Sequence, residues 1–372
     1  MGLKAALRYD VGAAISPHLA RLTSAYKAAV TPLLAGVEPD SRRFPMFDAM
    51  RLFAATSVIA LHVHNGMAPG LKEPRWMGLF FAVPLFLAIS GFLVLKSFGE
   101  SRSWPHFAWN RFLRVTPAWI ASLGLVGLLS GIHGVRSCLV FWASLGLHGS
   151  SADVPNGVYW SLGWEELMYA ILAVLYGLGA YRRPIAIWCL WAVSFMAAIP
   201  IINHFQEHWW LPTAFLRMCM AVLPAAFFLG NLCYLYRHSL IRSGAYSLVA
   251  LIFATACFGI RGSNYVVEFV HQQAFLFAAI WVGIAIRNPL PQLKADVSYG
   301  FYVYHLPLAR LFMGMDFQSP IVPFLITVSV TTHLSLASWY LIERPALKAK
   351  NARFRLPWRY GEDIQSTAVE AA

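Results

Sequence analysis

Three ionisable residues, Asp48, Arg51 and His62, lie in one apolar stretch of the sequence between residues 46 and 66. At about 100° per residue, the eleven-residue step from Arg51 to His62 nearly completes whole turns of an α-helix, and Asp48 lies one turn before Arg51. A helix would therefore present these three on one side and His64 on the other. Ionisable groups inside an apolar helix usually face a protein interior or a wet cavity, where they mark a pathway or a reaction centre. Alternatively, Asp48 and Arg51 pair with each other at a membrane boundary.

A second group lies in the segment WSLGWEELMY, residues 160–169. Glu165 and Glu166 are adjacent, so they point about 100° apart and at most one of them faces the interior, together with Tyr169 one turn later. A buried carboxylate near a histidine is a plausible acid/base partner. The alternative is helix capping, since Ser161 and two carboxylates in the first turns also favour a helix N-terminus.

Two further motifs contain side chains that could bind an anion or take part in catalysis. Arg111 and Arg114 are three residues apart after the second apolar run, so their guanidinium groups share a helix face and can hold phosphates bidentately. An ordinary basic loop would look the same. His305, with Pro307 after it, is either a chemical group or a hydrogen-bonded packing residue.

The composition indicates an all-α polytopic membrane protein. The chain is 58% hydrophobic and only 12% charged, well below the quarter that is usual in soluble domains. We expect about ten transmembrane helices plus a short re-entrant or interfacial segment at 138–149, which is too brief to cross the hydrocarbon core. The expected spans are 47–66, 76–95, 115–132, 158–180, 184–203, 212–235, 245–262, 266–286, 297–315 and 321–342.

The positive residues behind the net charge of +12 are distributed as the expected membrane topology requires. Most Lys and Arg residues fall in segments that are cytoplasmic when both termini are inside, which fits the positive-inside rule and argues against a nucleic-acid partner. We divide the chain into an amphipathic or partly ordered cytoplasmic segment (1–44), a transmembrane domain (45–346) and a short cytoplasmic tail (347–372). The five cysteines show no metal or disulfide spacing, and no metal is expected.

In order and spacing, these segments resemble the acyltransferase-3 family of integral membrane acyltransferases. The residues that match its motifs are Asp48, Arg51 and His62; Ser90, Gly91 and Phe92; Arg111, Arg114 and Pro117; Trp160, Ser161, Leu162, Glu165 and Tyr169; Ser298, Tyr299, His305 and Pro307; and Ile342–Pro345.

The resemblance implies an O-acyltransferase of the bacterial plasma (inner) membrane. Its donor would be acetyl-CoA or another acyl-CoA on the cytoplasmic side, with the phosphates on Arg111 and Arg114. His62 would act as general base or be acylated transiently, Glu165 would orient it, and Asp48 would position Arg51. The acceptor would be a hydroxylated molecule, such as a saccharide, a lipid-linked sugar or a small secreted metabolite.

Other residues are candidates for the substrate pocket: Ser90, Trp160, Ser161, Tyr169, Tyr299, Tyr302 and His305. A different class also fits the intramembrane charges. A secondary transporter or exporter could use Arg51, His62 and Glu165 as a proton or substrate pathway, although no repeated half with matching broken helices is visible.

Overall fold

The computed structural model describes residues 44–67, 82–101, 103–148, 153–207, 214–242, 265–285 and 295–349, and within these ranges it is helical. The predicted N-terminal segment 1–44, all but its last residue, and the tail beyond residue 349 lie outside the described residues. The helices are α2 (Pro45–Met67), α3 (Ala82–Gly99), α4 (Trp104–Ala143), α5 (Tyr159–Gly177), η2 (Ala180–Arg182), α6 (Pro184–Glu207), α7 (Ala214–Leu235), α8 (Arg237–Arg242), α10 (Tyr265–Ala285), α11 (Ser298–Met313), α12 (Ile321–Ser338), the π-helical turn η4 (Trp339–Glu343) and α13 (Arg344–Lys348).

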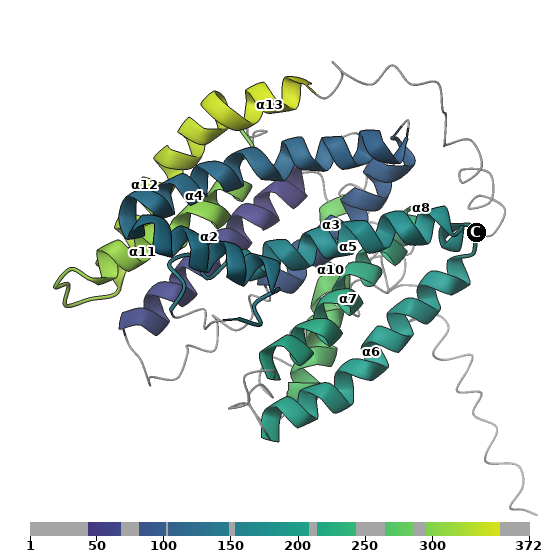
Figure 1. Cartoon of the computed structure of the whole chain (residues 1–372). Coiled ribbons are helices and arrows are strands. Elements are labelled where there is room, and N and C mark those ends of the chain that lie inside the picture. The colour runs from purple at the N-terminus through teal and green to yellow at the C-terminus, as the bar shows by residue number, and fades with distance from the viewer. Residues whose placement is uncertain are drawn as a thin grey trace, which may run out of the picture.

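The helices pack in two groups, which contact each other mainly through α2 of the first group and α3 and α10 of the second (Figure 1). On one side α11 packs along α12 and α2, although α2 and α12 are separated by more than 250 residues of sequence. On the other side α7 packs along both α3 and α6, and α10 lies against α7. Helices α4 and α5 contact each other and connect to α11 and α3, respectively. Residues from the start, middle and end of the chain therefore meet between the groups.

Glycines allow α3 and α7 to come unusually close. A Cβ atom at Gly91 would lie 2.2 Å from the carbonyl oxygen of Phe227, and one at Gly230 would lie 2.1 Å from the carbonyl oxygen of Ala88. The side-chain amide of Asn231 donates to the Gly91 carbonyl at 2.8 Å. Small residues and interhelical hydrogen bonds are the usual way to join helices in lipid, where the hydrophobic effect does not drive association. This contact fixes the position of α3 relative to α7.

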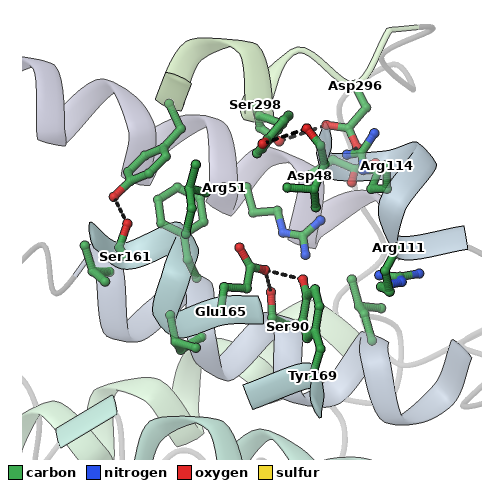
Figure 2. A pocket seen from close by; sticks show the side chains of 18 of the residues that line it. Asp48, Arg51, Ser90, Arg111, Arg114, Ser161, Glu165, Tyr169, Asp296 and Ser298 are labelled. Carbon is green, nitrogen blue, oxygen red and sulfur yellow. Dashed lines mark hydrogen bonds and ion pairs between the residues drawn. The ribbon is translucent and has the colours of Figure 1, made fainter. Parts of the chain in front are cut away.

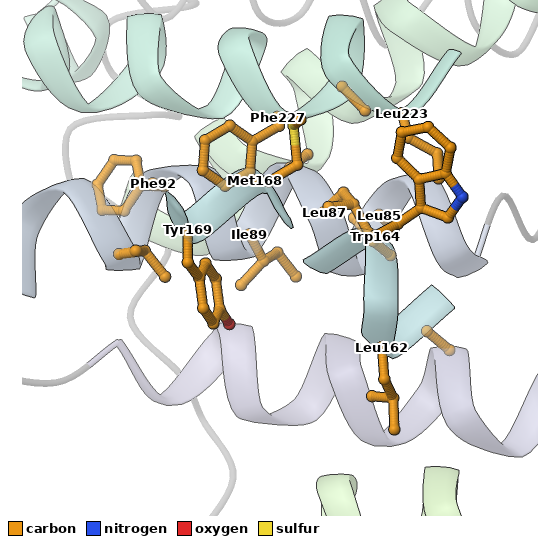
Figure 3. Close-up of a cluster of buried hydrophobic side chains, with 14 of the residues drawn as sticks. Leu85, Leu87, Ile89, Phe92, Leu162, Trp164, Met168, Tyr169, Leu223 and Phe227 are labelled. Atoms are coloured by element: carbon orange, nitrogen blue, oxygen red, sulfur yellow. The ribbon is translucent and has the colours of Figure 1, made fainter. Parts of the chain in front are cut away.

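Large apolar side chains fill the space between α3, α5 and α7 (Figure 3). Phe92 and Phe227 are fully buried, and Met168 of α5 lies between the two helices that carry them. The core thus holds α5 against α3, which places Glu165 of α5 beside Ser90 of α3.

Helix α4 differs from the expectation. The sequence predicts a span at 115–132 and a separate short segment at 138–149, whereas α4 runs on to Ala143. A straight helix of 40 residues would be about 60 Å long, twice the thickness of the hydrocarbon core. Helical geometry is interrupted at Gly131, whose φ of 65° is one that glycine adopts without strain. The predicted boundary near residue 132 corresponds to this interruption.

Six of the described helical segments are long and apolar enough to cross a membrane. They are Pro45–Met67, Ala82–Gly99, Trp104–Ala143, Pro184–Ile202, Val266–Ala285 and Ile321–Lys348. The predicted span at 297–315 corresponds to α11, which has only 16 residues. The predicted span at 245–262 lies outside the described residues. A helical membrane protein is therefore supported, and the count of about ten spans stays a prediction.

Candidate functional site

A cavity of about 390 Å³ lies where α2, α3, α4, α5 and α11 meet, close to the N-terminal ends of α2, α4 and α11 (Figure 2). Its wall combines apolar side chains with a larger number of polar and charged ones, which favours a ligand that carries polar or charged groups. The polar and charged residues that line it are Asp48, Arg51, Ser90, Arg111, Arg114, Ser161, Glu165, Tyr169, Asp296, Ser298, Tyr299 and Tyr302. Most of the site residues predicted from sequence are therefore brought together.

The carboxylate of Glu165 is held by two hydroxyl groups. Ser90 Oγ donates to Glu165 Oε1 at 2.5 Å, and the hydroxyl of Tyr169, one turn further along α5, donates to the same oxygen (Figure 2). Glu165 lines the cavity and its neighbour Glu166 does not, as expected from the 100° between adjacent helical residues. These two donors fix the orientation of the carboxylate toward the cavity.

Arg114 forms an ion pair with Asp296, a residue of the segment that precedes α11 (Figure 2). Ser298 Oγ donates to the other carboxylate oxygen at 2.8 Å, and the guanidinium lies 5.9 Å from the ring centre of Trp339. Burial alone raises the pKa of Asp296, but the charges of Arg114 and Arg51 and the bond from Ser298 outweigh it and lower the pKa to about 2. The charge of Arg114 is thus neutralised inside the protein.

Arg51 and Arg111 differ from Arg114. Within the described part of the chain, neither forms an ion pair with a carboxylate. Arg111 donates to Ser97 Oγ at 3.1 Å and lies 5.9 Å from the ring centre of Tyr169, while its buried Nε has no described hydrogen-bond partner. Arg51 extends into the middle of the residue group in Figure 2. The cavity therefore has two guanidinium groups available to an anion.

His62, Trp160 and His305 are not among the residues that line this cavity. The expectation that His62 and Arg51 share one water-accessible site therefore stays a prediction; eleven helical residues separate the two by about 16 Å along α2. The ring of His62 instead packs against His305, with ring centres 5.5 Å apart. The ring centre of Tyr302, which lines the cavity, lies 6.0 Å from that of His305, and the Tyr302 hydroxyl forms a hydrogen bond with Ser161 Oγ.

The contacts of three other predicted site residues are as follows. Glu165, expected to orient His62, is held by Ser90 and Tyr169 instead. Tyr299 lines the cavity while its hydroxyl donates to the Val115 carbonyl at 2.9 Å, and Trp160 packs against the apolar core. The residues predicted for one site thus divide between the cavity and a histidine pair next to its Tyr302 wall.

Residues 45–342 match the family model of the acyltransferase domain. The chain belongs to the acyltransferase-3 family. It is 27% identical over 357 residues to a protein of Rhizobium leguminosarum bv. viciae named nodulation protein 10, covering 82% of this chain and 94% of that protein. It is 26% identical over 340 residues to a protein of Shigella phage Sf6 named O-acetyl transferase, covering 83% and 98%, respectively. No solved structure matches the chain significantly.

The contribution of Asp296 to this acyltransferase was not predicted from sequence. Its partner Arg114 is 182 residues away, and a lone acidic residue between two apolar runs carries no local pattern. A signal was available in Ser298, two residues further on, which belongs to a family motif and donates a hydrogen bond to Asp296. Among the described residues, no group of three or more His, Cys, Asp or Glu side chains is placed to hold a metal ion.

Proposed function

We propose that this protein transfers an acyl group, most simply acetyl, from a cytoplasmic acyl-CoA to a hydroxyl group of a cell-envelope saccharide or similar acceptor. One observation carries the donor part of the proposal: the cavity wall holds two guanidinium groups, Arg51 and Arg111, that have no carboxylate partner in the described chain. Guanidinium groups bind phosphate oxygens through charge-assisted, often bidentate hydrogen bonds. The family and the relative named O-acetyl transferase support the acyl transfer.

The donor would enter from the side of the cavity formed by the first turns of α2 and α4. With both termini in the cytoplasm of a bacterial cell, this side faces the inner leaflet of the plasma membrane, where acyl-CoA is available. Arg111 and Arg51 would bind its phosphates, and the uncharged pantetheine arm would extend along the apolar wall toward Tyr302. Arg114, already paired with Asp296, would shape this entrance and would not bind phosphate itself.

His62 would perform the chemistry beyond Tyr302. As a general base it takes the proton of the acceptor hydroxyl while that oxygen attacks the thioester carbonyl; the C–O bond forms, the C–S bond breaks, and the proton passes to the leaving thiolate. In the alternative route, His62 attacks the carbonyl first and the acyl-imidazole is then transferred to the hydroxyl. Both routes need an imidazole nitrogen with a lone pair at this position.

The test uses the purified full-length protein with radiolabelled acetyl-CoA and a cell-envelope glycan fraction, and follows both label transfer and release of the CoA thiol. His62→Ala should lose at least about 100-fold of the transfer rate, in the range that a lost general base contributes. Arg51→Ala should lose transfer at limiting acetyl-CoA, because it removes a guanidinium that binds the donor phosphates. His64→Ala, two residues from His62 on another face of α2, is the matched control and should retain the rate.

Full transfer by His62→Ala would refute the assignment of His62. Uptake of substrate into vesicles without acyl-CoA, and without release of CoA, would favour the transporter class instead. Mass spectrometry of envelope glycans in a deletion strain would identify which acceptor loses its acyl group.

A further inference from the structure

The imidazole of His305 has one nitrogen with a defined partner. The side chain is fully buried, with 0% exposure, on α11. Its Nδ1 lies 3.0 Å from the carbonyl oxygen of Phe301, one turn earlier on the same helix. A carbonyl oxygen only accepts hydrogen bonds, so Nδ1 must carry the hydrogen. In a neutral ring the other nitrogen, Nε2, then carries a lone pair and acts as an acceptor.

Nε2 of His305 is buried and has no hydrogen-bond partner among the described residues. Buried polar atoms without a partner are uncommon in folded proteins, and each calls for an explanation. Two polar rings lie next to it, those of His62 and Tyr302. The Tyr302 hydroxyl is already bonded to Ser161 Oγ at 2.5 Å, so His62 is the neighbour left to supply a hydrogen.

The two imidazole rings are placed for such a bond. Their centres are 5.5 Å apart and their planes are inclined by 32°. A separation of 5.5 Å between ring centres leaves room for one N–H···N hydrogen bond when a nitrogen of each ring points toward the other. His62 is less buried than His305, so its ring has more freedom to turn into that orientation.

We propose that His305 is a positioning residue for His62: its Nε2 accepts a hydrogen bond from a ring N–H of His62, so that the second nitrogen of His62 presents its lone pair to the acceptor hydroxyl. This inference rests on the proposed role of His62. The backbone carbonyl of Phe301 fixes the tautomer of His305, and His305 in turn fixes the tautomer of His62. When His62 takes the acceptor proton, both its nitrogens carry hydrogen, and the lone pair of His305 stabilises the resulting cation. His305 itself stays neutral throughout.

Two substitutions at position 305 separate this role from packing. In His305→Gln the side-chain amide reaches the position of Nε2, so an acceptor for His62 is kept while the bond to Phe301 is lost. In His305→Asn the shorter amide reaches only the position of Nδ1, so the bond to Phe301 is kept while the acceptor for His62 is lost. A packing role predicts that the unfolding temperature falls together with kcat, and more for the smaller Asn, whereas the positioning role predicts a loss of kcat in His305→Asn while the unfolding temperatures of the two variants stay similar.

The measurement is kcat and KM for acetyl-CoA and for the glycan acceptor, with the purified full-length protein at matched abundance. We expect His305→Asn to lower kcat about 10- to 100-fold, as is usual for residues that orient an active group, with both KM values unchanged. His305→Gln should lower kcat less than 10-fold. An Asn variant as active as the wild type, or more active than the Gln variant, would overturn the inference.

Failure of this inference can be told apart from failure of the proposed function. If His62→Ala keeps its transfer rate, the proposed function is wrong and His305 has nothing to position. If His62→Ala is inactive while His305→Asn is fully active, the proposed function stands and the role of His305 is wrong.

If neither variant accumulates, the rate at which diethyl pyrocarbonate modifies His62 in the unchanged protein decides. An unprotonated imidazole nitrogen attacks a carbonyl carbon of this reagent with its lone pair. His62 should react faster than the similarly buried His64, and a rate equal to or lower than that of His64, measured by mass spectrometry, would overturn the inference.

Discussion

Arg111 and Arg114 are neighbours on one face of α4, and the structure predicts that removing them has different consequences. Arg114→Ala leaves the carboxylate of Asp296 without its ion-pair partner, so the main effect should be on stability. Arg111→Ala removes a guanidinium that lines the cavity without a carboxylate partner in the described chain, so the main effect should be on donor binding. The same motif thus contains a structural and a ligand-binding arginine.

The size of each effect follows from burial. Removing one partner of a buried ion pair costs about 3–5 kcal/mol. The side chains of Arg114 and Asp296 are 20% and 14% exposed, so solvent screening should bring the cost of Arg114→Ala below this range, to about 2–3 kcal/mol. Losing a hydrogen bond to a charged group costs about 1.5–3 kcal/mol, so Arg111→Ala should raise the KM for acetyl-CoA about 10- to 150-fold.

The assay is a double-mutant cycle on the purified protein, with thermal unfolding and donor KM measured for each variant. Arg114→Ala and Asp296→Asn should each lower the unfolding temperature. Their combination should lower it by clearly less than the sum of the two, because the second change no longer breaks a pair. Arg111→Ala should unfold close to the wild type. The reasoning fails if Arg114→Ala unfolds like the wild type and raises the donor KM as much as Arg111→Ala does.

The same pair predicts how stability depends on pH. The pKa of Asp296 is lowered from its ordinary value of 3.8 to about 2 in the folded protein. Its stabilising contribution is therefore complete above about pH 4 and is lost as the pH falls toward 2. Between pH 5 and pH 2 the unfolding temperature should fall less steeply for Asp296→Asn than for the wild type. Parallel curves of unfolding temperature against pH would contradict the assigned ion pair.

Two further predictions concern the helices around the cavity. Gly91→Ala should strongly reduce the folded yield, because its Cβ would lie 2.2 Å from a backbone oxygen of α7. Gly99→Ala on the same helix meets no atom within 4 Å and should accumulate normally. Size-exclusion chromatography of the detergent-solubilised variants measures both yields, and equal yields would contradict this packing. Glu165→Gln should lower kcat about 10- to 100-fold, because the amide oxygen can still accept from Ser90 and Tyr169 but the negative charge beside the cavity is lost. Glu166→Gln, outside the cavity, should stay within about twofold, and a similar loss in both variants would place the active carboxylate elsewhere.

The helices were predictable where one physical signal dominates. The apolar run at 47–66 predicted α2 within two residues, since length and hydropathy alone define such a segment. The side chains of Asp48 and Arg51 reach the cavity as expected, because residues three apart on a helix share a face whatever surrounds them.

Depth and long-range contacts were not predictable in the same way. The helical spacing predicts that His62 and Arg51 lie on the same face of α2. It does not predict which side chains of other helices lie between them, and in the structure Tyr302 of α11 lines the cavity beside the histidine pair. The role of Arg114 depended on Asp296, whose position beside α4 is set by the packing of α11 and α4 and by no local pattern.

The neighbouring positions of Ser90 and Gly91 have a consequence for how sequence changes propagate. Ser90 binds the carboxylate of Glu165, and Gly91 lies against the backbone of α7. The distance between α3 and α7 therefore determines where the hydroxyl of Ser90 lies. A bulkier side chain on that side of α7 would shift α3 as a rigid rod and withdraw the hydroxyl from its carboxylate. Those variants that still fold would be slow, although the substitution lies on α7, none of whose described side chains lines the cavity.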